Sequence, residues 1–373
     1  EITFTEWTSD GRLRQPSFQG LREDKPPEKV TREMPKSPAA LENSSSNGAM
    51  KTKTKRTKAS RAKSSGSKPT AASRNGKGEA VVAGVRLTNP DRVLYPEHGI
   101  TKLQLAEYYE RVADWILPYV VKRPLTLVRC PEGYTGECFF QKHFTGSLPD
   151  AVRAVMVPIK GKREEYVAVD DIAGVVALVQ MGVLEIHPWP AREDKLERPD
   201  QIVMDLDPGE GAEWKAVVDG AIEVRDRLAA VGLTSYLRTS GGKGLHVVVP
   251  LARRNTWDEL KQFAKAIADT MTREAPDRYL ATLSKAKRRG KVFVDYLRNQ
   301  RGATAIASYS TRRKSGAPVA VPIAWDELST RTKPDMYNIV NLPKRLEKLP
   351  TDPWEDFFST RQSITRKMMA AFE

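Results

Sequence analysis

The feature that most constrains this chain is the segment QIVMDLDPGEG at residues 201–211, where an apolar run ends in two carboxylates. Residues 202–204 predict a buried strand, and Asp205 and Asp207 close it. Side chains two residues apart in a strand point to the same face, so the two carboxylates are expected side by side. Adjacent anions repel each other unless a cation lies between them. The segment therefore predicts either a cation site or, because Asp-Pro-Gly is ordinary turn chemistry, a solvated turn.

A second apolar run, at residues 292–294, ends in Asp295. Three carboxylates on neighbouring strands would bind hard divalent cations, and two such ions suit in-line phosphoryl transfer. Taken alone, Asp295 is better explained as a strand-end acid paired with Arg298 or Arg301. A bound triphosphate would need several nearby cations. The arginines that bracket Asp295 are Arg288, Arg289, Arg298, Arg301, Arg312 and Arg313.

The segment TSGGKGLHVVVP, residues 239–250, supplies an anion-binding pattern. Ser240, Lys243 and the intervening glycines offer backbone N–H groups and a cation, a combination that cradles phosphates. The segment is not a Walker A motif, because the spacing differs and a strand follows it. His246 begins that strand and could face the same cavity. The alternative is a glycine-rich hairpin without a ligand, with a structural histidine.

Two other segments carry candidate binding side chains. VLEIHPW places Glu185 and His187 on one face of a predicted strand, and ECFFQKH contains Phe139 and Phe140 beside Lys142. Adjacent residues of a strand point to opposite faces. Core packing is the default expectation for both rings, and stacking on a base is the alternative for a ring beside a cation.

The composition favours a polyanionic partner. The chain has 373 residues, is 40% hydrophobic and carries a net charge of +14, which favours nucleic acid over an anionic membrane surface. No apolar run is long enough to span a bilayer, and the first residues lack a signal peptide. Cys130 and Cys138 are expected to form neither a zinc nor a disulfide framework, which fits a reducing, intracellular setting. The start at Glu1 indicates a fragment of a longer protein.

Composition divides the chain into zones. Residues 1–35 resemble the end of a folded unit. Residues 36–78 are rich in Lys, Ser and Ala, with ten Lys or Arg and no acid between Lys51 and Lys77, and predict a disordered basic linker. The linker would be a plain spacer, a non-specific DNA tether, or both. A globular pattern covers residues 79–360, followed by a tail at 361–373.

The globular zone mixes helices and strands without a strict βαβ repeat. This mixture predicts an α+β fold with a largely antiparallel central sheet. Helices are expected at residues 101–120, 171–182, 212–232 and 256–276. Strands are expected at residues 123–130, 165–170, 183–189, 201–208, 234–240, 245–251, 291–299 and 304–311.

Three of these motifs together resemble a known family. MDLDPG, SGGKGLHVVVP and VFVDYLRNQRGATAIASYSTR are similar, in order and spacing, to the polymerase domain of bacterial DNA ligase D. That domain belongs to the archaeo-eukaryotic primase superfamily, and the resemblance covers roughly residues 80–360. The opening LRQPSFQGLREDKP resembles the last motif of the ligase domain of the same enzyme. The implied order is a C-terminal remnant of a ligase OB-type domain at 1–35, the linker, and a primase-like catalytic domain.

The resemblance implies a role for each matching residue at the catalytic centre. Asp205, Asp207 and Asp295 would be the catalytic residues and bind two metal ions, with manganese generally preferred over magnesium. Residues implied to contact the nucleotide are Ser240, Lys243 and His246 at the triphosphate, Arg288 and Arg312 near the phosphates or the metal site, and His187 near the sugar.

The resemblance also implies a DNA interface. Phe140 would stack on the incoming base and Phe139 on the template. Arg92 and Lys102 match basic residues that hold the 5′-phosphate of a downstream strand. Position 92 is more often Lys in the family, and an Arg keeps the charge but changes the geometry.

These expectations predict a template-directed nucleotidyltransferase that fills gaps and extends ends in non-homologous end joining, with a preference for ribonucleotides among NTP and dNTP substrates. Expected partners are DNA ends and gaps with a 5′-phosphate, a Ku-type protein, and a ligase domain in cis. The expected location is the bacterial cytoplasm, at the nucleoid. Ligase activity is not expected, because no Lys-x-Asp-Gly motif is present. A two-metal nuclease and a non-catalytic DNA-bridging module are the rival interpretations.

Overall fold

The computed structural model describes residues 79–144, 146–159 and 161–372, and outside them the backbone of five short strands. The chain divides into two compact units, Glu1–Gly66 and Ser67–Glu373. In the first unit, β1 (Ile2–Thr3) pairs with β4 (Ser17–Phe18), and β2 (Glu6–Trp7) pairs with β3 (Leu13–Arg14). The predictions for residues 1–35 and 36–78 otherwise lie outside the described residues. Ser73–Asn75 are an exception, because they form strand β5 within the predicted linker.

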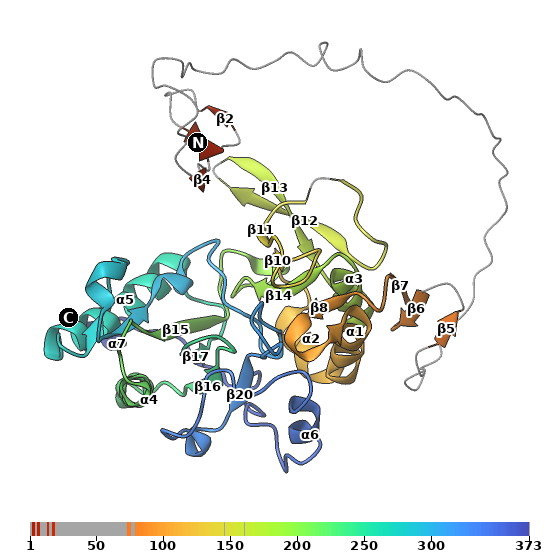
Figure 1. The fold of residues 1–373 in the computed structure, drawn as a ribbon. Helices are drawn as coiled ribbons and strands as arrows, with labels where there is room; N and C mark the ends of the chain where they lie inside the picture. The colour runs from red at the N-terminus through yellow and green to blue at the C-terminus, as the bar shows by residue number, and fades with distance from the viewer. Residues whose placement is uncertain are drawn as a thin grey trace, which may run out of the picture. The chain divides into compact units, whose positions relative to one another are not determined.

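The second unit is built around a six-stranded sheet in the order β18-β19-β15-β17-β16-β20. Strands β15, β17, β16 and β20 of this sheet are labelled in Figure 1. All neighbouring strands are antiparallel except the pair β18 and β19. The largely antiparallel α+β fold predicted from the sequence is therefore confirmed. The strands are β15 (Gln201–Pro208), β16 (Tyr236–Thr239), β17 (Leu245–Pro250), β18 (Tyr279–Leu280), β19 (Val292–Asp295) and β20 (Val321–Ile323).

Two long helices contact this sheet. Helix α4 (Trp214–Ala230) packs on the face that carries Leu206, and a Cβ at Gly220 would lie only 3.0 Å from Leu206 Cδ2. Helix α5 (Trp257–Glu274) begins at a capping box made by Thr256 and Glu259 and buries an apolar stripe. Because strand side chains alternate, Asp205 and Asp207 project from the face opposite Leu206.

A second sheet lies in the same unit and contains β10 (Leu125–Arg129), β11 (Phe139–Gln141), β12 (Arg153–Ile159), β13 (Lys162–Ala168) and β14 (Val183–Pro188). Strand β10 is central, because it pairs with β11, β13 and β14. Helix α3 (Ile172–Gln180) contacts β14 and is capped by Asp171, whose side chain accepts a hydrogen bond from the Gly174 N–H.

The N-terminal part of this unit contains β6 (Glu79–Val82), β7 (Val85–Thr88), β8 (Val93–Tyr95) and β9 (Ile100–Thr101). The single helix expected at residues 101–120 is divided into α1 (Lys102–Arg111) and α2 (Ala113–Val120). The helix breaks at Val112, whose φ of −101° and ψ of 21° are not helical. The Thr101 cap was predicted correctly.

The strand predicted at residues 304–311 is wrong. This segment is an irregular connection in which Tyr309 has a φ of 67°, a left-handed conformation that a strand cannot contain. Instead of pairing in a ladder, the segment bonds to β14. Ala307 N–H donates to the Ile186 carbonyl, and Ile186 N–H donates to Ser310 Oγ.

The chain ends inside the second unit, with α6 (Leu342–Leu346) and α7 (Arg366–Ala370). The residues predicted as a tail pack against the unit, because Ile364 and Phe372 are buried and Gln362 donates to the carbonyls of Thr234 and Pro250. No helix in the described part of the chain is long and apolar enough to cross a membrane.

Candidate active site

Four polar side chains form a row across the central sheet. The register pairs Asp295 of β19 with Asp205 of β15, Asp205 with His246 of β17, and His246 with Arg238 of β16. Residues in register on adjacent strands share one face of the sheet. All four residues are at most 5% exposed, so this row is a buried line of charge at one end of the sheet.

The contacts within the row orient Asp205. Arg238 Nη2 lies 2.7 Å from His246 Nδ1, and His246 Nε2 lies 3.3 Å from Asp205 Oδ1. Burial lowers the pKa of His246 to about 4 despite the nearby Asp205 carboxylate. The neutral ring therefore accepts a hydrogen bond from Arg238 at Nδ1 and directs its Nε2–H toward Asp205. Both ring nitrogens are engaged, so the triphosphate contact predicted for His246 would require it to release one partner.

Arg298 lies between the two facing carboxylates. Its Nε is 3.2 Å from Asp205 Oδ2 and 3.2 Å from Asp295 Oδ2. Arg298 belongs to the short 3-10 helix η7 (Leu297–Asn299), which Asn299 fastens to β15 by hydrogen bonds to the N–H and carbonyl of Val203. The pairing of Asp295 with Arg298 considered from the sequence is therefore present, together with the carboxylate cluster.

Asp207 has no cation of its own in this cluster. Repulsion from Asp205, together with burial, raises the pKa of Asp207. Burial alone would raise the pKa of Asp205, but the contact with His246 and the charge of Arg298 outweigh it and hold that pKa well below its usual range. Asp295 has a raised pKa, mainly because of burial. The cluster thus holds more negative charge than Arg298 neutralises.

The carboxylates fit a hard divalent cation in chemistry but are not arranged as a finished coordination shell. Among the described residues, no group of three His, Cys, Asp or Glu side chains is placed to hold a metal ion. Arg298 explains this, because its guanidinium occupies the space between Asp205 and Asp295. Asp205 Oδ1 is buried, and its polar contact among the described residues is the 3.3 Å approach of His246 Nε2, so this oxygen retains room for a further cation. The residues that could bind such ions are Asp205, Asp207 and Asp295.

The glycine loop lies directly beside Asp207. Ser240 Oγ accepts hydrogen bonds from the N–H groups of Gly242 and Gly244, at 3.2 and 3.1 Å, and this fixes a tight turn. A Cβ at Gly244 would lie 2.6 Å from Asp207 Oδ1 and 2.1 Å from the Leu206 carbonyl oxygen. Only glycine permits this close approach of the loop to β15. Lys243 is exposed at the tip of the loop, as an anion-binding residue requires.

Arg312 connects the glycine loop to the second sheet. Its Nη1 lies 3.5 Å from the Ser240 carbonyl oxygen, and its Nε lies 3.4 Å from Glu185 Oε1. Glu185 also accepts a hydrogen bond from the Arg313 N–H and contacts His187 Nε2 at 2.8 Å. The structure therefore brings Arg312 and His187 together through Glu185. Arg288 lies on the Asp207 side of the cluster. Its guanidinium lies 3.7 Å over the ring of Phe293, which pairs with Asp207, and its charge opposes the rise in the pKa of Asp295. It also donates a hydrogen bond to the Leu283 carbonyl.

Phe139 and Phe140 are both exposed, at 42% and 69%, so the default expectation of core packing is wrong for both. They lie on opposite faces of β11, as predicted from strand alternation. The Phe140 ring is 6.2 Å from the His187 ring, and Phe139 lies 5.5 Å from the Arg129 guanidinium. A large exposed ring on each face of one strand is a surface suited to stacking.

Arg92 and Lys102 form a separate basic site. Lys102 N–H donates to the Arg92 carbonyl, and the Lys102 ammonium donates to the Thr88 carbonyl at 2.8 Å. Burial and the charge of Arg92 lower the pKa of Lys102. Arg92 Nη1 donates to the Pro131 carbonyl. Neither cation has an acidic partner in the part of the chain that the structure describes, and such a pair suits a phosphate ligand.

The sequence prediction for the cysteines is wrong, because Cys130 and Cys138 form a disulfide. Strand β10 ends at Arg129 and β11 begins at Phe139, so the antiparallel pairing of these two strands brings the intervening chain back to its start. The Cα atoms of the two cysteines are 4.4 Å apart as a result. The bond closes the loop that carries Pro131, the partner of Arg92, and leads into Phe139.

Arg238 is the residue that the sequence analysis missed. It is 4% exposed, and its Nη1 donates to Ser308 Oγ while Nη2 contacts His246. The sequence did contain a signal for Arg238. It lies in the predicted strand segment YLRT, two residues before Ser240, so its side chain is expected on the same strand face as that of Ser240. An arginine buried in a sheet requires hydrogen-bond partners or an opposite charge on that face.

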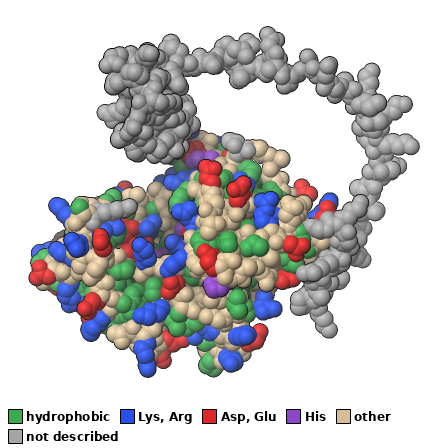
Figure 2. Space-filling view, in the orientation of Figure 1, with side chains coloured by type: hydrophobic (Ala, Val, Ile, Leu, Met, Phe, Trp, Pro, Cys, Tyr) green, Lys and Arg blue, Asp and Glu red, His purple; other side chains and the backbone are tan. Residues whose placement is uncertain are grey.

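On the face shown in Figure 2, Lys and Arg side chains are interspersed with Asp and Glu. The net charge of +14 is therefore not concentrated in one uniformly basic patch on this view, and residues 51–77 of the linker alone contribute ten cations. Specific sites such as Arg92 and Lys102 must be identified by their geometry.

Residues 101–354 match the family model of the LigD primase-polymerase domain. A similar solved structure, the polymerase domain from Mycobacterium tuberculosis ligase D in complex with DNA, is 32% identical, with a TM-score of 0.69 over 74% of this chain and 98% of that one. The fold and the site therefore define a nucleotidyltransferase domain of the primase-polymerase class. Within that class, the chain belongs to the LigD primase-polymerase domain family.

Curated relatives support the same family assignment. The multifunctional non-homologous end joining protein LigD of Pseudomonas aeruginosa is 39% identical over 99% of this chain and 41% of its own length. The bifunctional non-homologous end joining protein LigD of Bacillus subtilis is 30% identical over 74% of this chain and 45% of its length. The chain thus spans less than half the length of the curated relatives it matches.

Proposed function

We propose that this chain is a template-directed nucleotidyltransferase that adds nucleotides, preferably ribonucleotides, to a primer 3′-OH at gaps and broken ends during non-homologous end joining. The observation that carries the proposal is the contact between the carboxylate cluster and the phosphate-type loop. Asp207 and Gly244 are close enough that no side chain fits between them. A nucleotide triphosphate held by the loop would thus have its phosphates beside Asp205, Asp207 and Asp295.

The chain's own residues would prepare this site. His246 and Arg298 fix the Asp205 carboxylate, while Ser240 holds the loop N–H groups in one orientation. Arg312 and Lys243 would bind phosphate oxygens, because both lie at the loop. When bound to the three aspartates, two Mn²⁺ or Mg²⁺ ions would activate the 3′-OH and neutralise the leaving pyrophosphate.

The substrate would be held by the second sheet and the N-terminal basic site. Phe140 is the more exposed ring and adjoins His187, which suits the base and sugar of an incoming nucleotide. Phe139, on the other face of β11, would contact the template. Arg92 and Lys102 would bind the 5′-phosphate of the downstream strand. We propose a Ku-type protein and a ligase domain in cis as partners, in line with the end-joining relatives.

The loop also separates this proposal from its rivals. A nuclease uses carboxylates and metal ions but binds no triphosphate, so Ser240 and Lys243 would have no role in it. A non-catalytic bridging module would bind DNA ends through the same surfaces without needing Asp205.

The test is primer extension on gapped DNA with a 5′-phosphate on the downstream strand, using Mn²⁺ and either rNTPs or dNTPs. Wild type should extend the primer along the template, faster with rNTPs, while Asp205→Ala should bind the DNA but not extend it. Shortening of the primer would indicate a nuclease. Extension at the wild-type rate by Asp205→Ala would disprove the assignment of the site. Binding without extension by wild type would leave only the bridging function.

A further inference from the structure

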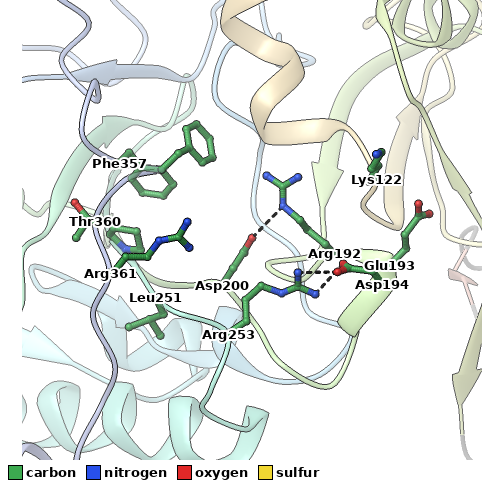
Figure 3. Close-up of a pocket in the computed structure, with 12 residues that line it drawn as sticks. Lys122, Arg192, Glu193, Asp194, Asp200, Leu251, Arg253, Phe357, Thr360 and Arg361 are labelled. Carbon is green, nitrogen blue, oxygen red and sulfur yellow. Dashed lines mark hydrogen bonds and ion pairs between the residues drawn. The ribbon is translucent and has the colours of Figure 1, made fainter.

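A pocket of about 600 Å³ lies at the end of the central sheet where β15 begins (Figure 3). Gln201 of β15 pairs with Pro250 of β17, and Leu251 N–H donates to the Asp200 carbonyl at the floor of the pocket. Asp205 is the fourth residue after Gln201 along β15, which places it about 13 Å away. The pocket is therefore separate from the catalytic row. A volume of this size suits a nucleotide-sized ligand.

The acids that line the pocket are already neutralised. Asp194 accepts two hydrogen bonds from Arg253, at 2.9 and 2.7 Å. Glu193 and Asp200 each accept two hydrogen bonds from an arginine behind them, Arg153 and Arg123 respectively.

Three cationic side chains in the lining have N–H donors that are free, or nearly free, to bind a ligand. Within the described part of the chain, the ion pair of Arg192 is a single long one, 3.7 Å from its Nε to Asp200 Oδ2. Among the described residues, the side chains of Lys122 and Arg361 make no hydrogen bond or ion pair, and both are exposed. The side chains of Arg192 and Arg361 extend from opposite walls toward the middle of the pocket (Figure 3). Burial and the charges of Arg123 and Arg253 lower the pKa of Arg192, although the carboxylates of Asp200 and Asp194 lie nearby.

An aromatic wall completes the pocket. Phe357 is buried and stacks on Trp354, with ring centroids 4.5 Å apart. Phe358 packs edge-on against Phe357 and remains 40% exposed. An exposed ring beside three available cations offers a stacking surface for a base and donors for its phosphates.

We propose that this pocket binds an unpaired nucleotide of a nucleic acid strand, with the base on Phe358 and the phosphates on Lys122, Arg192 and Arg361. A phosphate-bearing nucleobase satisfies both the ring and the cations, whereas an inorganic anion would leave the ring unused. The net charge of +14 favours a strand as its source over a free nucleotide. The site would hold a single-stranded overhang or a displaced strand apart from the catalytic centre.

The test uses photo-crosslinking of the full chain to a four-nucleotide thymidine strand that carries 5-iodouracil. EDTA is present and triphosphates are absent, so the result does not depend on polymerase activity. After reduction and trypsin digestion, a crosslink in the pocket appears on the peptide of residues 349–361, which contains Phe358. A crosslink at the proposed active site appears on the peptide of residues 130–142, which contains Phe139 and Phe140. The two sites are therefore read out separately.

The expected result is a crosslink on residues 349–361 whose yield falls about fivefold or more in Phe358→Ala and in Lys122→Glu. The matched charge reversal Lys333→Glu, at an exposed lysine outside the pocket, should leave it unchanged. Thermal melting and primer extension of each variant would exclude misfolding as the cause. If ATP competes with the crosslink as strongly as the unlabelled strand does, the pocket recognises the proposed base and phosphates, but its ligand is a free nucleotide.

Two results would overturn the proposal. One is crosslinking confined to residues 130–142, with equal yields in all variants. The other is displacement of the strand by poly-glutamate as effectively as by unlabelled DNA, since charge alone would then explain the binding.

Discussion

Asp205 and Asp295 face each other directly on neighbouring antiparallel strands, although 90 residues separate them in the sequence. The sequence around each aspartate does not by itself predict that the two carboxylates face each other. The shared register of β15 and β19 forces two buried carboxylates together, and Arg298 is the cation that makes the pair tolerable.

Arg298→Ala tests this role of the guanidinium. Removing it leaves two buried carboxylates without their shared cation, so we expect the metal-free protein to lose about 2 kcal/mol of stability. Mn²⁺ should then raise the Tm more in the variant than in wild type, because it replaces a missing cation. Differential scanning calorimetry with increasing Mn²⁺ measures both effects. Arg301→Ala, which removes a surface pair with Glu197, is the control. An equal Mn²⁺ response in Arg298→Ala and wild type would contradict a metal site at these carboxylates.

Gly244→Ala tests the contact between the loop and β15. The new methyl group would lie within 2.6 Å of Asp207 Oδ1, so either the loop or the carboxylate must move. We expect a loss of about 2 kcal/mol of stability and at least a tenfold slower extension rate. Gly242→Ala is the matched control in the same loop, because its nearest neighbours lie 3.4 Å from the added Cβ. Similar extension rates in the two variants would show that the loop need not approach Asp207.

Glu185→Gln tests the link between the two sheets through the pH dependence of stability. Burial raises the pKa of Glu185, but His187, Arg312 and the Arg313 N–H outweigh it and lower the pKa to about 2. A depressed folded-state pKa contributes stability above the unfolded value of about 4.5, and this is lost as the pH falls toward 2. The contribution at neutral pH is about 3 kcal/mol. Urea unfolding between pH 7 and pH 2.5 should show a smaller loss in the variant, and parallel curves would rule out this linkage.

Reduction of the Cys130–Cys138 disulfide is expected to lower the stability of the protein by about 2–3 kcal/mol, through the entropy of the loop it closes. Measurement of Tm with and without reductant gives this difference. The double variant Cys130→Ser, Cys138→Ser should be insensitive to reductant and should melt like the reduced wild type. Detection of two free thiols in the native, unreduced protein would show that the bond does not form.

Much of the site could be predicted from the sequence, because its signals are local. Alternation in a strand placed Asp205 and Asp207 on one face and Phe139 and Phe140 on opposite faces. The glycines of the loop indicated a close backbone approach, which Gly244 makes. The helix at residues 101–120 and the strand at 304–311 were less well predicted, because Val112 and Tyr309 adopt backbone conformations that follow from tertiary packing.

The sequence alone determined the order of the elements, the clustering of acids at strand ends, the anion-binding loop and the family. These depend on spacing over a few residues, which is fixed by the geometry of the strand and the turn. Only the tertiary structure decided that Arg238, His246, Asp205 and Asp295 form one row, that Arg298 separates the carboxylates, and that Cys130 reaches Cys138. Only the tertiary structure assembled the second pocket from segments between Lys122 and Arg361. These relationships depend on strand register and on contacts between distant segments, which local spacing does not specify.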